Sequence, residues 1–230
     1  MTTMLMGLAA LLSAAFGVHM FRRYQSRRAP FYFWWGISFL LYAAAFFMEA
    51  LTVAHNWRQI WEYQVYIVAS AGLVGAMSVG TTHLALGSSK WARGYAFYFV
   101  VAEVALLIFT LLFPPTLSGT WQQLNAGQHG IVGPTQVVYI LLSAIGGPIV
   151  MLGSLWSWWK TRRYYTLLIA AGALVPSMAG TLASQGSTTA LFPLLNVVGL
   201  ILIFLGYVYS KSPAARTHSE PLLVARNRMR

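Results

Sequence analysis

The stretch "FYFWWGISFLLYAAAFFMEALTV" (residues 31–53) decides the fold. It contains a single charged residue, Glu49, and the nearest charged residues outside it are Arg28 and Arg58. A run of about 20 mostly apolar residues is long enough to cross the hydrocarbon core of a bilayer as a helix. The stretch therefore predicts a transmembrane helix that carries one carboxyl group.

Six further stretches have the same character: 3–21, 65–87, 95–114, 135–158, 166–184 and 191–209. The whole chain is 58% hydrophobic and 8% charged, whereas a soluble domain is roughly 25% charged. We therefore predict an all-α integral membrane protein with seven transmembrane helices in one domain, residues 1–209. Residues 210–230 form a polar, basic tail that we expect to be disordered.

The positions of the Lys and Arg residues predict the orientation in the membrane. Fourteen of the 15 lie in alternate connections or in the tail, and Arg58 is the exception. Cytoplasmic connections accumulate Lys and Arg, so we expect the N-terminus outside and the C-terminus in the cytoplasm of a cell (inner) membrane. The net charge of +11 thus marks a membrane surface, and we expect lipid partners and no nucleic-acid partner.

Two stretches, 11–28 and 141–163, both begin with "LLSA" and end on a pair of basic residues. They suggest a parallel repeat of three helices, one linking helix and three helices. This layout, with the N-terminus outside, resembles that of small sugar transporters, opsins and seven-helix receptors in topology alone. An opsin needs a lysine in its last helix, and residues 191–209 contain none, so we expect no retinal.

Glu49 belongs to a polar stripe on its predicted helix. Ser38, Tyr42, Ala45, Glu49 and Thr52 follow one another at steps of three or four residues, which places them on one face. Lipid offers such side chains no hydrogen-bond partner, so the stripe should face the bundle or a water-filled cavity. The alternative is that Glu49 lies near the outer boundary and reaches water or a neighbouring helix.

Glu103 lies nearer the centre of its predicted helix, 95–114. A charged side chain there costs about 2.5–3.5 kcal/mol. We therefore expect Glu103 to be neutral or to have a partner on an adjacent helix, either in ligand binding or only in helix packing. His83, beside two threonines, could relay protons, bind a polar headgroup or simply bond to the backbone.

Glycines and prolines indicate where helices approach or bend. Gly72, Ala76 and Gly80 recur at four-residue steps, which predicts a close packing seam in a central third helix. Proline precedes Ser177 in the sixth predicted helix and Asn196 in the seventh. Since interrupted helices often line transport sites, we expect a polar cavity lined by the second, third, sixth and seventh helices, with the fourth as a further candidate.

Three functions remain open. The first is a transporter or membrane sensor that binds a small or lipophilic ligand through Glu49, Glu103, Tyr42, His83, Ser177 and Asn196. The second is a membrane-embedded enzyme acting on an isoprenoid or lipid, with Glu49 or Glu103 as general acid. The third is an accessory subunit of a membrane complex, whose carboxyl groups would be capped by neighbours beneath a broad apolar face that contacts a protein partner.

We expect no metal and no cofactor. The chain has no cysteine, and its histidines and carboxyl groups show no ligand spacing such as that of a helical H-E-x-x-H. A cavity that reaches Glu49 or Glu103 would distinguish the first two functions from the third.

Overall fold

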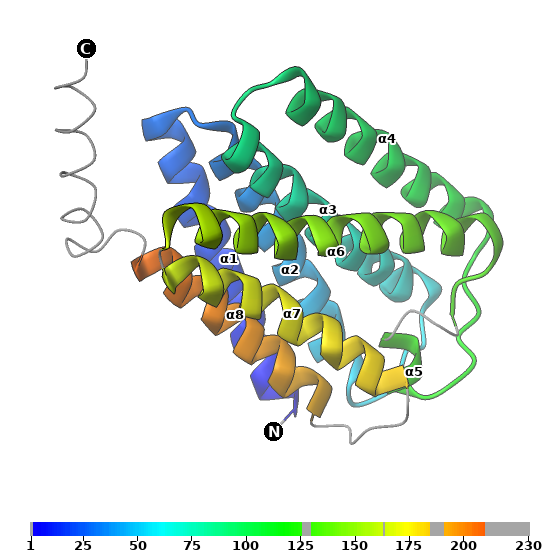
Figure 1. Ribbon diagram of the computed structural model, residues 1–230. Coiled ribbons are helices and arrows are strands. Elements are labelled where there is room, and N and C mark those ends of the chain that lie inside the picture. Colours follow the sequence, from blue (N-terminus) through cyan, green and yellow to red (C-terminus); the bar gives the residue numbers. More distant parts are fainter. Residues whose placement is uncertain (1, 126–129, 163, 185–190, 210–230) are drawn as a thin grey trace, which may run out of the picture.

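The computed structural model describes residues 2–125, 130–162, 164–184 and 191–209, and all of its regular elements are helices. The C-terminal tail therefore lies outside the described residues. The helices, labelled in Figure 1, are α1 (Thr2–Arg27), α2 (Pro30–Thr52), α3 (Ile60–Leu86), α4 (Lys90–Leu112), α5 (Trp121–Asn125), α6 (Gly133–Thr161), α7 (Tyr164–Ser184) and α8 (Leu191–Tyr209).

Five helices, α1, α2, α3, α4 and α6, are long and apolar enough to cross a membrane. In α7 and α8 the apolar stretches within the described part are shorter, Tyr164–Pro176 and Pro193–Tyr209. The regular structure of the described residues is thus all helical, and its long apolar helices have the character of a multi-pass membrane protein. All seven predicted stretches coincide with a long helix, and the short α5 lies in the predicted outer connection, 115–134.

Several helices extend beyond the apolar stretch that predicts them, because a helix ends at a cap and not at the edge of its apolar run. α3 begins five residues before position 65, where a capping box joins the Gln59 backbone N–H to Glu62 Oε2 at 3.3 Å. It ends at Leu86 and is followed by the cap residue Gly87, whose φ of 62° suits glycine. The cap residue before α4 is Ser89, whose hydroxyl oxygen accepts a hydrogen bond from the Ala92 N–H at 3.2 Å.

The third helix is the centre of the molecule, as the small-residue seam predicts. α3 contacts α2, α4 and α6, and most of its residues are buried. Added Cβ atoms at Gly75 and Gly80 would collide with the rings of Phe99 and Trp35. The seam therefore lets aromatic side chains of α2 and α4 lie directly against the α3 backbone.

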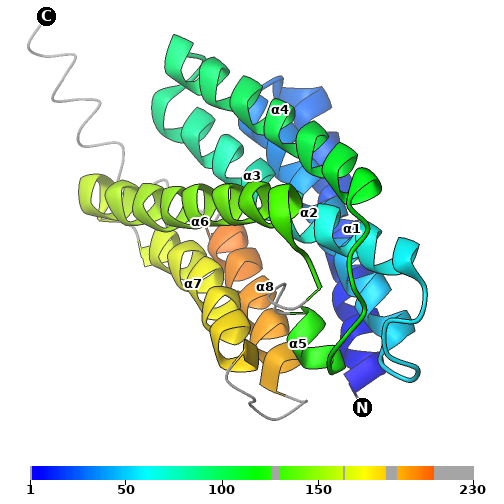
Figure 2. The ribbon, with the colours of Figure 1, turned by 90° about the vertical axis from the view of Figure 1, so that its right-hand side faces the viewer.

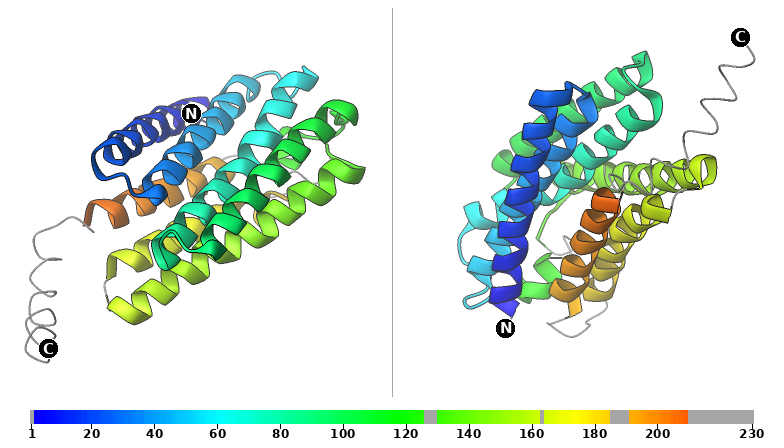
Figure 3. Two further views of the ribbon diagram at one scale, coloured as in Figure 1. Left: turned by 90° about the horizontal axis from the view of Figure 1, so that it is seen from above. Right: turned by 90° about the vertical axis from the view of Figure 1, so that its left-hand side faces the viewer.

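The remaining helices form two groups around a central gap. In one group, α2 packs between α1 and α3; in the other, α7 packs against both α6 and α8. The two groups meet mainly where α3 contacts α6 and, at the opposite edge, where α1 contacts α8 (Figures 2 and 3). α4 lies outside, against α3 and α6, and exposes much of its apolar surface.

The connection that contains α5 is held against α2 and α3 by buried hydrogen bonds. The Trp121 indole N–H donates to Thr52 Oγ1 at 3.0 Å, and the Tyr63 hydroxyl donates to the Leu124 carbonyl at 2.8 Å. The Trp57 indole N–H donates to Asn125 Oδ1 at 2.9 Å. In Figure 1, α5 lies at the end of the bundle where α3 and α6 begin.

Candidate functional site

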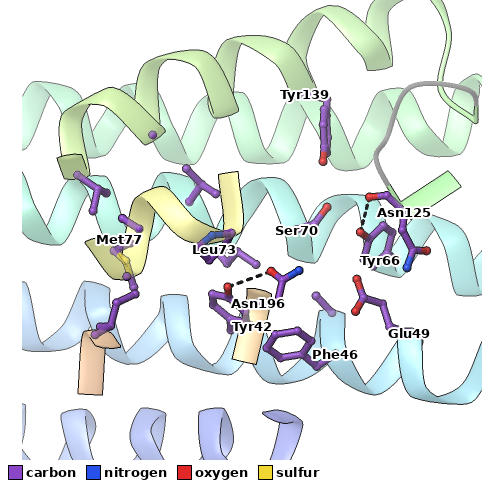
Figure 4. A pocket seen from close by; sticks show the side chains of 18 residues that line it. Tyr42, Phe46, Glu49, Tyr66, Ser70, Leu73, Met77, Asn125, Tyr139 and Asn196 are labelled. Carbon is purple, nitrogen blue, oxygen red and sulfur yellow. Dashed lines mark hydrogen bonds between the residues drawn. The ribbon is translucent and has the colours of Figure 1, made fainter. Parts of the chain in front are cut away.

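A cavity of about 190 Å³ lies between the two helix groups. Six elements contribute to its wall, namely α2, α3, α5, α6, α7 and α8. Figure 4 shows the side chains around it, and the polar ones are Tyr42, Glu49, Tyr66, Ser70, Asn125, Tyr139 and Asn196. Liquid water occupies about 30 Å³ per molecule, so the space suits roughly six waters or one small solute.

The sequence-predicted stripe of α2 faces this interior. All five of its members, Ser38, Tyr42, Ala45, Glu49 and Thr52, are buried. Tyr42, Ala45 and Glu49 line the cavity, while the two hydroxyl residues at the ends of the stripe bond to backbone carbonyls. Glu49 thus lies inside the bundle, and its side chain does not reach outward to water.

Glu49 is 3% exposed, and its Oε2 atom has no hydrogen-bond partner among the described residues. Buried polar atoms in proteins are nearly always hydrogen-bonded, so an unpartnered carboxyl oxygen in a cavity wall indicates a ligand-facing atom. The Nδ2 atom of Asn125, in the same wall, also lacks a partner in the described part. One acceptor and one donor are therefore directed at the cavity.

The hydroxyl group of Tyr66 lies in the same wall and bonds to the α5 connection. It donates to the Asn125 carbonyl oxygen at 2.6 Å, as the dashed line in Figure 4 shows. A tyrosine hydroxyl has one proton, and a backbone carbonyl can only accept. Because the proton is directed to Asn125, the Tyr66 oxygen can only accept a hydrogen bond from the cavity.

A second tyrosine of the wall, Tyr42, also uses its hydroxyl proton within the protein. Tyr42 donates to Asn196 Oδ1 at 3.4 Å. The oxygens of Tyr42 and Tyr66 therefore offer lone pairs to the cavity, and a ligand with hydrogen-bond donors would match them.

The described lining contains no Lys, Arg or His, and Glu49 is the sole carboxyl group in it. Nothing in this wall would neutralise an anionic ligand. The rest of the surface is apolar, contributed among others by Phe46, Leu73 and Val150. The cavity thus suits a small solute with an apolar portion and several donors.

The structure brings three of the predicted site residues together, Tyr42, Glu49 and Asn196. Ser177 follows Pro176, which lines the cavity, but its side chain lies outside the described residues. The predicted second, third, sixth and seventh helices, here α2, α3, α7 and α8, all contribute. The prediction omits α5 and α6, and α4, its further candidate, is not part of the described wall.

Glu103 lies apart from this cavity, between α4 and α3, where the absence of a side chain on Gly72 makes room for its carboxyl group. Both carboxyl oxygens are buried and have no hydrogen-bond partner within the described ranges. The partner expected on an adjacent helix is therefore not found there. The geometry gives a ligand-binding role of Glu103 no further support, and we do not include it in the site.

His83 also lies elsewhere, near the end of α3. Its Nδ1 atom is 3.1 Å from the carbonyl oxygen of Gly87. This contact is the bond to the backbone that we expected as the alternative to proton relay or headgroup binding. It does not line the cavity, and its predicted role in ligand binding stays a prediction.

Sequence reasoning missed four residues of the wall. Tyr66, Ser70 and Tyr139 lie within predicted helices, and Tyr66, Ser70, Leu73 and Met77 follow the same three- and four-residue steps that reveal the α2 stripe. The spacing of polar and apolar residues on α3 could therefore have predicted Tyr66 and Ser70. Asn125 is different, because no local pattern predicts that a residue of a connection returns to a helix interior.

A second, larger hollow of about 710 Å³ lies between the ends of α3 and α6. Its lining includes the hydroxyl residues Thr81 and Thr82, and most of the rest is apolar or aromatic, including the exposed rings of Trp156 and Trp159. In a membrane-crossing helix bundle such a surface is the ordinary boundary with lipid. We therefore place the candidate site at the cavity that contains Glu49.

No protein-family model, no curated protein and no solved structure matches this chain.

Proposed function

We propose that the chain crosses a cell (inner) membrane seven times, with the N-terminus outside and the C-terminus in the cytoplasm. Five helices already satisfy the length and hydropathy of a membrane span, and α7 and α8 pack beside them at comparable lengths. The basic residues of the connections α1–α2, α3–α4 and α6–α7 support this orientation. The α5 connection then lies on the outer side.

We further propose that the protein is a transporter for a small, hydrogen-bonding solute. One observation carries this proposal: Glu49 is buried in the wall of a cavity between two helix groups, with Oε2 unpartnered among the described residues. A single ionisable residue inside a membrane bundle is a functional-site candidate by default. Binding sites between two helix groups are typical of transporters that expose the site to alternate sides.

The position of the cavity favours transport over the other two functions. An accessory subunit would have capped carboxyl groups, whereas Glu49 Oε2 has no cap in the described structure. An enzyme acting on an isoprenoid or lipid would need a long apolar cavity at its carboxyl group, and ligand pockets for drug-sized molecules span about 300–1,000 Å³. The space at Glu49, about 190 Å³ with seven polar side chains, favours a smaller and more polar solute.

Filling the cavity provides the test. Gly147 on α6 lines it, and an added Cβ there meets no atom within 4 Å, so Gly147→Leu should place its side chain in the empty space. Gly94 on α4 is a matched control, because an added Cβ there is equally unobstructed and Gly94 is remote from the cavity. The full chain would be purified in detergent and screened for thermal stabilisation by sugars, polyols, amino acids and amines.

We expect at least one solute class to stabilise the wild type and the Gly94→Leu variant, with the effect lost in Gly147→Leu. Uptake of that solute into proteoliposomes should show the same pattern. A solute that binds equally to all three proteins would overturn the assignment of the site. Binding that depends on Gly147 without any uptake would overturn transport and favour a sensor.

A further inference from the structure

We propose that the solute is a small primary amine, bound as its ammonium ion, and that its binding releases a proton from Glu49. This inference rests on the proposed function and narrows it to one substrate class and one coupling ion. It is carried by the burial of Glu49 in the cavity wall, by the absence of basic residues from the described lining and by the unpartnered oxygen of Glu49.

In the empty cavity, Glu49 is buried in a wall whose described lining has no basic residue. The Tyr66 hydroxyl in the same wall directs its proton to the Asn125 carbonyl and not to the carboxyl group. The other ionisable groups that face Glu49 are the phenols of Tyr42 and Tyr139. Neither supplies a positive charge, and an isolated carboxylate at this depth is costly. Glu49 is therefore neutral when the cavity is empty.

The charge of the described wall favours a cationic ligand. A cation that enters the cavity meets one group able to become an anion, and the described wall contains no Lys, Arg or His to repel it. When Glu49 gives up its proton, the cation and the carboxylate neutralise each other. The cavity has no net charge before or after binding, so the exchange avoids the cost of an unpaired buried charge.

An ammonium group has three N–H donors and no acceptor. The wall offers it the unpartnered Glu49 Oε2, the oxygen of Tyr66, whose hydroxyl proton is directed to Asn125, and the oxygen of Tyr139. Figure 4 shows these groups extending toward one region from α2, α3 and α6. A quaternary ammonium ion has no N–H group and would leave them unbonded.

The ammonium ion enters from water with all of its N–H bonds intact. The O–H bond of Glu49 breaks, its proton leaves to water, and an ion pair forms between the nitrogen and the carboxylate. Tyr66 can then turn its hydroxyl proton from the Asn125 carbonyl to the carboxylate, which weakens the hold of α3 on the outer connection.

The experiment uses n-butylamine, which is an ammonium ion at neutral pH, and n-butanol, the neutral molecule with the same carbon chain. The full chain is placed in lipid nanodiscs, and binding is measured by calorimetry with protein-free nanodiscs subtracted. A pH indicator in weakly buffered solution counts the protons released. We expect butylammonium to bind, butanol to bind at least tenfold more weakly, and about one proton to be released per bound ammonium ion.

Two variants locate the effect. Glu49→Gln keeps the shape of the side chain and removes its charge, and we expect it to weaken butylammonium binding roughly tenfold to a hundredfold and to abolish proton release. Glu103→Gln makes the same change at the buried carboxyl group outside the cavity and should behave as the wild type. Thermal unfolding checks that both variants are folded, and the proton count of the wild type needs no variant.

Three results would overturn the inference: equal binding of butanol and butylammonium, ammonium binding without proton release, or tetramethylammonium binding as tightly as butylammonium. The proposed function has a separate outcome. If butylammonium does not bind but another solute binds in a manner that depends on Gly147, the amine inference fails and the transporter proposal stands. If no solute binds at all, both fail.

Discussion

At the residue scale, Glu49 and Tyr66 define the polar part of the cavity wall. The Tyr66 hydroxyl donates to the Asn125 carbonyl in the α5 connection, and Glu49 of α2 lies in the same wall with Oε2 unpartnered among the described residues. In the proposed exchange, an ionised Glu49 would compete with the Asn125 carbonyl for the Tyr66 proton. The charge of Glu49 would then affect the packing of α5.

The hydrogen bond from Tyr66 to Asn125 should contribute measurably to stability. Tyr66→Phe leaves the ring in place but removes the donor to a buried carbonyl, and we expect it to lower the free energy of unfolding by about 1–2 kcal/mol. Tyr98→Phe is a suitable control, because the Tyr98 hydroxyl is buried without a partner in the described structure and its loss should be neutral or stabilising. Thermal unfolding in detergent measures both, and equal effects would show that the Tyr66 bond does not act as described.

Part of the site was predictable from residue spacing. Tyr42 and Glu49 share a helix face because an α-helix repeats every 3.6 residues, and Asn196 stands out as a polar side chain in an apolar helix. Tyr66 and Ser70 follow the same spacing on α3 but are less conspicuous beside the small residues of that helix. Glu103 shows what residue spacing cannot predict, since the position of a residue near the centre of its helix does not tell which neighbouring helix the side chain faces.

At the element scale, α3 determines how closely the other helices approach. Its small residues admit Phe99 from α4 and Trp35 from α2 to the backbone, and its opposite polar side chains line the cavity. The same helix thus supplies both the packing centre and one wall of the site. A change in the seam should therefore affect stability before it affects ligand contacts.

Gly80→Ala tests the seam. The added methyl group would collide with the Trp35 indole, whose residue is 4% exposed and has little room to move, so we expect a loss of about 1–3 kcal/mol in unfolding free energy. Gly94→Ala, made in α4 where no atom lies within 4 Å of the new Cβ, should instead stabilise by up to about 1 kcal/mol through helix propensity. Denaturation in mild detergent compares the two, and the reverse order of stability would contradict close packing at the seam.

At the scale of the whole molecule, the two helix groups and the α5 connection together form the cavity wall. α5 contacts α7 of one group, and it is hydrogen-bonded to α2 and α3 of the other group. Both groups therefore contact α5. A relative movement of the groups would be expected to disturb these contacts. The direction in which the cavity opens depends on the orientation of the bundle in the membrane.

The orientation can be tested with cysteines, because the chain contains none. Ser118, in the connection that contains α5, and Ser88, between α3 and α4, are both exposed. We expect a membrane-impermeant maleimide to label Ser118→Cys in intact cells and to label Ser88→Cys only after permeabilisation, since basic connections stay in the cytoplasm. Labelling of Ser88→Cys in intact cells would reverse the proposed topology.

The sequence by itself determined the helical class, the approximate limits of the long helices, the face of α2 that is buried and the central place of α3. These follow from the length of apolar runs, from caps and from the helical repeat, which are local properties of the chain. Only the tertiary structure decided that Glu49 and Glu103 lie on different sides of α3, and that Tyr139 and Asn125 join Glu49 in one wall. Those relations depend on how helices rotate and pack against distant partners, and no local pattern records them.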